Sequence, residues 1–259
     1  MPETPAMPAN GTPGRFLVDL HLHSCLSPCG DLDMSPRRIA REARLRGLSA
    51  AALCDHNSAL NCPAFEVACE SEGILGIYGI EVTSREEVHL LCLFDSVDAA
   101  LEMGDYLYRL LMSGAYDAAR FGDQIYVNED EVILGNVEKH LIGAVDLSLE
   151  EIGREAQRRG GLFIPAHIDR AVYSVSSQLG FLPEGNYDAV EIVRSSSTPM
   201  ARGVPIVASS DAHFPGDIAA RHSVVESTDL TLAGISRALS AGLVTPVFAS
   251  PNLPDRECG

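Results

Sequence analysis

The chain has 259 residues, of which 46% are hydrophobic, and a formal net charge of -17. This length and composition fit a globular protein with one barrel-sized domain or two small ones. No apolar run reaches the ~20 residues that a membrane span needs. The negative charge disfavours wrapping of a nucleic-acid backbone, which normally needs a basic face. It does not exclude a small anionic substrate, because bound cations can outweigh nearby carboxylates.

Both ends of the chain are expected to lie outside the folded domain. Residues 1–14 are rich in Pro, Ala and Thr and lack the basic start and apolar core of a secretory signal, so we expect a disordered lead. Residues 251–259 are expected to be a loose tail, which leaves one domain over 15–250. Seven cysteines without a repeated CxxC spacing indicate reduced thiols. We therefore expect a cytoplasmic protein with no membrane attachment, and the sequence leaves its oligomeric state open.

Predicted strands and helices alternate along the chain. The first apolar run starts at Phe16 and ends in Asp19-Leu20-His21-Leu22-His23. A helix begins at Ser35-Pro36, where Ser is a good N-cap and Pro suits the first helical position, and Gly47 ends it. Another begins with the capping box Ser148 to Glu151 and runs to 159. Further strands are expected at 48–54, 74–80, 88–94, 162–166, 189–193, 204–209 and 244–248, and further helices at 61–72, 96–113 and 232–241.

Residues 115–146 interrupt this alternation. The runs 124–127 and 131–134 flank Asn128-Glu129-Asp130, a pattern that predicts a hairpin. We expect an insertion that lies over the functional site or at its rim. The alternative is a surface excursion without a role in chemistry.

Strands that alternate with helices about seven times predict parallel strands covered by helices. An open doubly wound sheet and a closed barrel both satisfy the pattern. No GxGxxG or GxxxxGK[ST] follows a strand, so neither nucleotide-binding fingerprint is present. No GxSxG nucleophile elbow is present either.

Ionisable side chains gather at or near the ends of the predicted strands. His21 and His23, two residues apart on a strand, would project together. In a (β/α) barrel the C-terminal strand ends meet on one face, where catalytic residues gather. His89 lies near the start of its strand, unlike the others. The whole set is His21, His23, Asp55, His56, Glu81, His89, His167, Asp211 and His213.

This mixture of imidazoles and carboxylates suits Zn, Mn or Fe. The set is too large for one ion, so we expect two to three divalent ions with a carboxylate such as Glu81 or Asp211 bridging them. Clustered divalent ions lower the pKa of a bound water and stabilise displacement at phosphorus. The residues therefore predict metal-dependent hydrolysis of a phosphate ester. We assign catalytic roles to Glu81, Asp211 and His167, and Cys25 or Cys29 are alternative ligands.

Six segments in order also resemble the successive motifs of the PHP (polymerase and histidinol phosphatase) family. They are Asp19-Leu20-His21-Leu22-His23, Cys54-Asp55-His56-Asn57, Gly79-Ile80-Glu81-Val82, Val88-His89-Leu90-Leu91, Pro165-Ala166-His167 and Ser209-Ser210-Asp211-Ala212-His213. Their order and spacing agree from Phe16 to about Phe248. The resemblance implies an α/β fold, a distorted seven-stranded (β/α) barrel of TIM-like type with a small insertion. It also implies a trinuclear metal centre and phosphoesterase activity.

The resemblance also implies which residues bind metal. The Asp that members usually place before the first helix is Asp31 when counted back from Ser35-Pro36, with Asp33 as competitor. Many relatives carry a further histidine beside an Arg in the insertion, but the surroundings of His140 do not match. The implied metal ligands are His21, His23, Asp31, His56, Glu81, His89, His167, Asp211 and His213.

Phosphate oxygens usually also need a cationic clamp, for which Arg is suited. Arg170 is the first candidate and Arg194 the second. The favoured function is a phosphatase of a small phosphorylated substrate, a phosphomonoester or nucleotide. The alternatives are an exonuclease on short oligonucleotide ends and a non-catalytic metal-binding module. The acidic balance and the lack of a basic, aromatic-rich stripe argue against other nucleic acids as partners.

Overall fold

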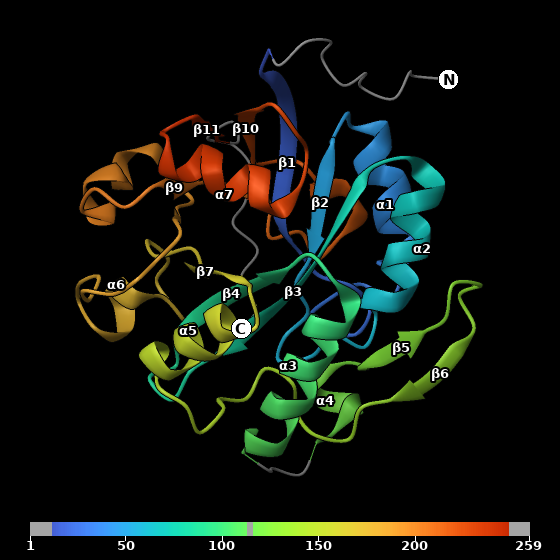
Figure 1. The fold of residues 1–259 in the computed structure, drawn as a ribbon. Coiled ribbons are helices and arrows are strands. Elements are labelled where there is room, and N and C mark those ends of the chain that lie inside the picture. The colour runs from blue at the N-terminus through green and yellow to red at the C-terminus, as the bar shows by residue number, and fades with distance from the viewer. Residues whose placement is uncertain (1–11, 113–115, 249–259) are drawn as a thin grey trace.

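The computed structural model describes residues 12–112 and 116–248. Its main sheet has the strand order β11-β10-β1-β2-β3-β4-β7 and is strongly curled (Figure 1). The strands of this sheet are β1 (Gly14–Leu22), β2 (Ala50–Leu53), β3 (Leu75–Thr83), β4 (His89–Phe94), β7 (Leu162–Pro165), β10 (His222–Ser227) and β11 (Val244–Val247).

The strand directions differ from the all-parallel pattern that we expected. Strands β1, β2 and β3 are parallel to one another. Strand β4 is antiparallel to both β3 and β7, and β10 is antiparallel to both β1 and β11. Strand β10 was not predicted, because its half-polar sequence lacks an apolar run. The prediction of parallel strands is therefore correct only for β1 to β3, and the sheet is mixed.

The sheet also does not close into the barrel that we expected. The pair β8 (Val190–Glu191) and β9 (Ile206–Val207) forms a separate parallel sheet of two-residue strands. Isolated backbone hydrogen bonds link it to its neighbours, from Asp188 N to Phe163 O and from Asp211 N to His21 O. Because strands this short end the ladder on both sides, the fold is a curled half-barrel.

The five predicted helices form at the expected places, and the short helices α4 (Ala118–Phe121) and α6 (Val175–Gln178) were not predicted. The five are α1 (Pro36–Leu45), α2 (Cys62–Glu72), α3 (Val97–Leu110), α5 (Leu149–Arg158) and α7 (Leu232–Ser240), and 3-10 turns occur at Ser195–Ala201 and Pro215–Asp217. Ser35 caps α1 by accepting from Arg38 N, and Ser148 and Glu151 form the predicted capping box of α5. Among the described residues, none of these helices has both the length and the apolar character that a membrane crossing requires.

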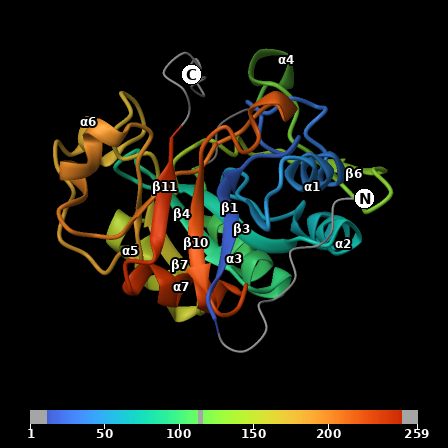
Figure 2. The same cartoon turned by 90° about the horizontal axis from the view of Figure 1, so that it is seen from above.

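Both faces of the sheet are buried over β2, β3, β4 and β7, which explains the continuous apolar runs in these strands. On one face, residues such as Ile80 and Cys92 pack with Phe65 of α2 and Met103 of α3. On the other face, strand residues including Val18, Ala52, Leu91 and Ile164 form a second core that α7 closes with Ile235 and Leu239. Figure 2 shows α7 beside β10 and β11, seen from above. The strand ends are thus held rigidly from both sides.

Gly79 lies where the second core leaves no room for a side chain. An added Cβ would lie 2.6 Å from Cys54 Sγ and 2.8 Å from a Leu93 methyl carbon. We expect Gly79→Ala to lower the free energy of unfolding by about 1–3 kcal/mol, the usual cost of overpacking. Gly216→Ala is the control, because nothing lies within 4 Å of the place that its Cβ would occupy and its φ is not positive. Equal denaturation midpoints for the two variants would contradict this packing.

The insertion forms the expected hairpin. Strands β5 (Ile125–Val127) and β6 (Ile133–Asn136) are antiparallel. The hairpin packs on the loop that follows β1, where Ile125 N donates to Cys25 O at 3.1 Å. Its turn is tied to the start of α1 by Ser35 Oγ, which donates to Glu131 Oε1 at 2.5 Å. A role of the insertion in substrate access stays a prediction.

Candidate metal centre

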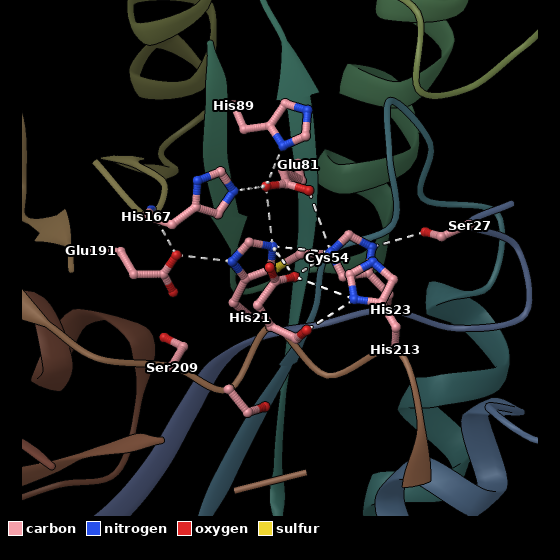
Figure 3. Close-up of polar contacts among 12 residues, drawn as sticks. His21, His23, Ser27, Cys54, Glu81, His89, His167, Glu191, Ser209 and His213 are labelled. Atoms are coloured by element: carbon pink, nitrogen blue, oxygen red, sulfur yellow. Dashed lines mark hydrogen bonds and ion pairs between the residues drawn. The ribbon is translucent and has the colours of Figure 1, made fainter. Parts of the chain in front are cut away.

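Glu81, near the end of β3, is the centre of the site, and it is buried with five imidazoles around its carboxylate. Figure 3 shows His21, His23, His89 and His167 among them. Its Oε1 lies 3.0 Å from His89 Nδ1 and 3.0 Å from His167 Nε2. The distance from the same oxygen to His21 Nε2 is 3.3 Å. Its Oε2 lies 3.1 Å from His56 Nδ1 and 3.3 Å from His23 Nε2. The structure thus brings together side chains from separate strand ends.

His21 and His23 project to the same side, as the sequence predicts. Their Nε2 atoms lie 3.0 Å apart, and both rings are fully buried. The pairing of β1 with β2 shifts register between Asp19 and Leu22. Such irregularities re-aim side chains at functional sites. Here the shift occurs directly where the two histidines leave the strand.

The place of His89 follows from the antiparallel pairing of β3 and β4. Thr83 pairs with His89 and Glu81 with Leu91, so the start of β4 lies at the same end of the sheet as the end of β3. His89 Nδ1 therefore reaches Glu81 although His89 begins its strand. The ring of Tyr173 stacks on His89 with a centroid distance of 4.6 Å.

Asp211 and His213 approach the cluster from the loop after β9. Asp211 Oδ1 lies 3.3 Å from His21 Nε2 and 3.1 Å from His23 Nε2. His213 stacks on His23 with ring centroids 4.1 Å apart. The φ angle is 52° at Asp211 and 28° at His167, in the left-handed region that non-glycine residues rarely adopt. Such backbone strain is typical of functional sites.

The donor atoms form three groups that could each hold a divalent metal ion. In each group, all donor atoms lie within 4.8 Å of one another. Among the described residues, several buried polar atoms here also lack a hydrogen-bond partner, including His89 Nε2 and His167 Nδ1. Imidazole and carboxylate donors match Zn, Mn and Fe. The groups are His23, His56 and His213; His21, His23, Glu81 and Asp211; and His56, Glu81 and His89.

The charges in the cluster oppose the effect of burial on the two carboxylates. Burial alone raises the pKa of Glu81, but His89, His21 and His56 bring it well below its usual value. Likewise, burial raises the pKa of Asp211, and His21 and Arg170 more than offset it. Both side chains are thus held as carboxylates, the form that binds metal.

The same arrangement separates the pKa values of two stacked histidines. Burial lowers the pKa of His23, but hydrogen bonds to Asp211 and Glu81 outweigh it and raise the pKa to about 9. For His213, burial and the neighbouring His23 lower the pKa to about 3. Near pH 7, His213 is therefore a neutral imidazole, whereas His23 is a positively charged imidazolium in the absence of metal.

The structure places Asp31 beside the cluster but not with its carboxylate in it. Asp31 N donates to His213 O at 2.9 Å, whereas its Oδ1 accepts from Asp33 N at 2.8 Å. Neither Asp31 nor Asp33 belongs to the three groups of donor atoms found among the described residues. Of the two nearby cysteines, Cys25 donates to Ile125 O, and Cys29 Sγ lies 3.4 Å from His56 Nε2.

The assignment of Asp31 as a ligand stays a prediction, and two variants test it. If its carboxylate turns inward to a metal ion, Asp31→Ala should lose about one ion per chain, whereas Asp33→Ala should retain all of them. Elemental analysis after dialysis against metal-free buffer measures the difference. Loss of an ion in Asp33→Ala alone would show that Asp33, and not Asp31, is the metal ligand in this loop.

The two candidate arginines lie in different surroundings. Arg170 is buried beside the cluster, where its guanidinium donates to Asp211 Oδ2 and its Nε has no hydrogen-bond partner in the described structure. It lines the same cavity as His167 and Tyr173. The Arg194 side chain is 52% exposed, and its NH2 group donates to Asp169 O at 2.7 Å. The geometry thus favours Arg170 over Arg194 as a group that faces a substrate.

Sequence reasoning missed one acidic residue of the site. Glu191 is buried on β8, with Oε2 3.1 Å from His21 Nδ1 and 2.9 Å from His167 N. Glu191 lies in the middle of the predicted strand 189–193, so the strand-end signal that identified Glu81 did not reveal it. Asp55 was noted among the strand-end residues, but its oxygens accept hydrogen bonds from Ser24 and Ser27.

Comparison with known proteins decides the family. Residues 19–193 match the PHP domain family, which is more than half of the chain. This chain belongs to the PHP domain family. The resemblance expected from the motifs is thereby confirmed, and the matched segment contains Glu81 and its five imidazole neighbours.

Two curated relatives of this PHP chain have names that refer to nucleic acids. A 5'-3' exoribonuclease of Haemophilus influenzae is 30% identical over 122 residues, which cover 39% of this chain and 43% of the relative. The DNA polymerase III subunit alpha of Treponema pallidum is 24% identical over 214 residues, or 76% of this chain and 18% of the relative. The chain therefore spans less than half the length of these two relatives.

Solved structures share the fold. The lesion-specific endonuclease Q of Pyrococcus furiosus aligns with a TM-score of 0.66 at 20% identity, over 90% of this chain and 58% of that one. A two-domain protein of Bacteroides vulgatus, which contains a predicted PHP-like metal-dependent phosphoesterase, aligns with a TM-score of 0.56 at 18% identity. That alignment covers 95% of this chain and 68% of the other. At these identities the likeness shows the fold alone.

Proposed function

We propose that this PHP chain is a metal-dependent phosphoesterase that hydrolyses a phosphomonoester or a nucleotide-type small molecule. The observation that carries the proposal is a buried cluster in which five imidazoles contact Glu81 and Asp211 contacts His23. Purely structural ion pairs would not require so many imidazoles around one carboxylate. Two to three divalent ions, Zn, Mn or Fe, would satisfy these donors.

The proposed ligands are the eight residues of the cluster and the nearby Asp31. When bound, such ions supply a water of lowered pKa and oppose the charge that develops on the phosphoryl oxygens. Glu81 is the proposed bridging carboxylate, since its two oxygens face different sets of imidazoles. The proposed ligand set is His21, His23, Asp31, His56, Glu81, His89, His167, Asp211 and His213.

Arg170 is the proposed clamp for a phosphate oxygen. Its guanidinium is anchored by Asp211, which leaves its other N–H groups to donate toward the cavity. A planar guanidinium can hold two oxygens of one phosphate at once. Arg194 is the second candidate, because it ends the segment after β8, but its bond to Asp169 O occupies part of its guanidinium.

A second candidate function is a nuclease that acts on oligonucleotide ends. The names of the exoribonuclease and endonuclease Q relatives favour nucleic-acid substrates. The net charge of -17 favours a small or short substrate over a long duplex. Both functions use the same phosphate-ester chemistry, and they differ in what is attached to the phosphate.

One experiment tests the function and separates the two candidates. Protein of measured metal content is incubated with nucleoside monophosphates, p-nitrophenyl phosphate and short 5'-phosphorylated RNA and DNA, and both released phosphate and strand length are followed. Phosphate release from the monoesters supports the first candidate, and shortening of the oligonucleotides supports the second. Metal-loaded protein with no activity on any of these substrates would contradict both.

A further inference from the structure

Ser27 contacts two of the proposed metal ligands without itself reaching the cluster. It is fully buried in the loop after β1, and its Oγ lies 2.9 Å from His23 Nδ1. The same Oγ lies 3.3 Å from His56 N and 2.7 Å from Asp55 Oδ1. Figure 3 shows Ser27 on the side of the His23 ring that faces away from Glu81.

The hydrogen-bond capacity of a hydroxyl group determines the direction of each contact. A serine hydroxyl has one hydrogen to donate and two lone pairs that accept. His56 N can only donate, so it takes one lone pair. Asp55 also receives donors from Ser24 N at 2.7 Å and Ser24 Oγ at 2.6 Å, which marks it as an acceptor. The hydrogen of Ser27 therefore goes to Asp55.

One lone pair of Ser27 Oγ then remains for His23, so His23 Nδ1 must be the donor. An imidazole with a proton on Nδ1 keeps the Nε2 lone pair for a metal ion. His23 Nε2 is the nitrogen that faces Asp211 Oδ1 at 3.1 Å and Glu81 Oε2 at 3.3 Å. The Asp55–Ser27 pair thus selects the nitrogen of His23 that lies among the other donors.

We propose that Ser27 is a positioning residue of the metal centre, which transmits the acceptor character of Asp55 to His23 and fixes its metal-binding tautomer. This inference rests on the proposed metal centre. Ser27 also fixes the backbone of His56, so one hydroxyl orients two members of the group formed by His23, His56 and His213. Outer partners of this kind typically change metal affinity by about 10–100-fold.

Ser24 offers a matched control for the same carboxylate. Its Oγ donates to Asp55 Oδ2 and accepts from Asn61 Nδ2 at 2.8 Å, and neither partner is a proposed metal ligand. Ser24→Ala and Ser27→Ala therefore each remove one buried hydroxyl bonded to Asp55. Only Ser27→Ala removes the acceptor of His23 Nδ1–H. Ser27→Thr keeps a hydroxyl at the same position.

The test measures Zn²⁺ affinity by competition with a chelator and folding by circular dichroism. We expect Ser27→Ala to bind Zn²⁺ about 10–100-fold more weakly than the wild type. Ser24→Ala and Ser27→Thr should bind within about threefold of it. Equal affinity of Ser27→Ala and the wild type would overturn the inference, as would an equal loss in Ser24→Ala. Wild-type protein without Zn²⁺ binding would instead overturn the proposed function.

A second measurement uses the wild-type protein and therefore does not depend on the folding of a variant. In the long-range ¹H–¹⁵N spectrum of Zn-loaded wild-type protein, His23 should show a protonated Nδ1 and a metal-bound Nε2. A protonated Nε2, or zinc bound through Nδ1, would contradict the proton count at Ser27 Oγ.

Discussion

Glu81→Gln should reduce phosphate release by more than about 100-fold, while the protein stays folded. Outer partners of metal ligands already change affinity or activity by about 10–100-fold, and Glu81 contacts five imidazoles directly. The substitution keeps the size of the side chain but removes the negative charge that attracts the ions. Metal content should fall together with turnover, because one carboxylate serves more than one group of donors.

The control for Glu81→Gln is Glu150→Gln. Glu150 lies exposed on α5, where it pairs with Arg154. The Glu150→Gln variant loses the same charge far from the cluster, so its turnover and metal content should match those of the wild type. Turnover and metal content of Glu81→Gln within twofold of the wild type would remove Glu81 from the metal centre. Circular dichroism checks that both variants are folded.

Metal affinity should rise steeply between pH 7 and pH 9. Burial lowers the pKa of His23, but Asp211 and Glu81 raise it to about 9 in the metal-free protein, so a proton must leave before metal binds. The apparent affinity for Zn²⁺ or Mn²⁺ should therefore increase about tenfold from pH 7 to pH 8 and about fivefold from pH 8 to pH 9, as the neutral fraction of His23 grows. Chelator competition at pH 7, 8 and 9 measures it, and a flat profile would contradict the raised pKa.

The stability of the metal-free protein should change in the opposite direction. The pKa of His23 is raised from its unfolded value of 6.5 to about 9. Its protonation therefore stabilises the fold fully below pH 6.5, and this contribution is lost as the pH rises through 9. Replacing His23 by Gln should flatten this part of the pH dependence in thermal unfolding. An unchanged profile in His23→Gln would assign the pH dependence to other groups.

Much of the site could be predicted because its residues sit at strand ends and carry distinctive chemistry. His21, His23, His56, Glu81 and His167 all follow or end apolar runs, and the structure brings them within contact of one another. These residues can be located from the local sequence, because a buried strand determines the direction in which the side chains at its end project. The helix caps at Ser35 and Ser148 were predictable for the same reason.

The remaining features depend on pairings that no local pattern records. Strand β10 has alternating burial and antiparallel neighbours, so the rhythm of strand and helix did not reveal it. The roles of Ser27 and Glu191 appear only when segments distant in the sequence meet, as in the Ser27–Asp55 and His21–Glu191 contacts. A neutral serine in a loop gives no chemical signal by itself.

Metal content of gently purified protein tests the central claim most directly. Elemental analysis should find two to three Zn, Mn or Fe ions per folded chain, or uptake of that number when Mn²⁺ or Zn²⁺ is added. Glu81→Gln should bind fewer ions in the same assay. A wild-type protein that holds less than one equivalent and takes up none would contradict the assignment of the Glu81 cluster as a multinuclear metal centre.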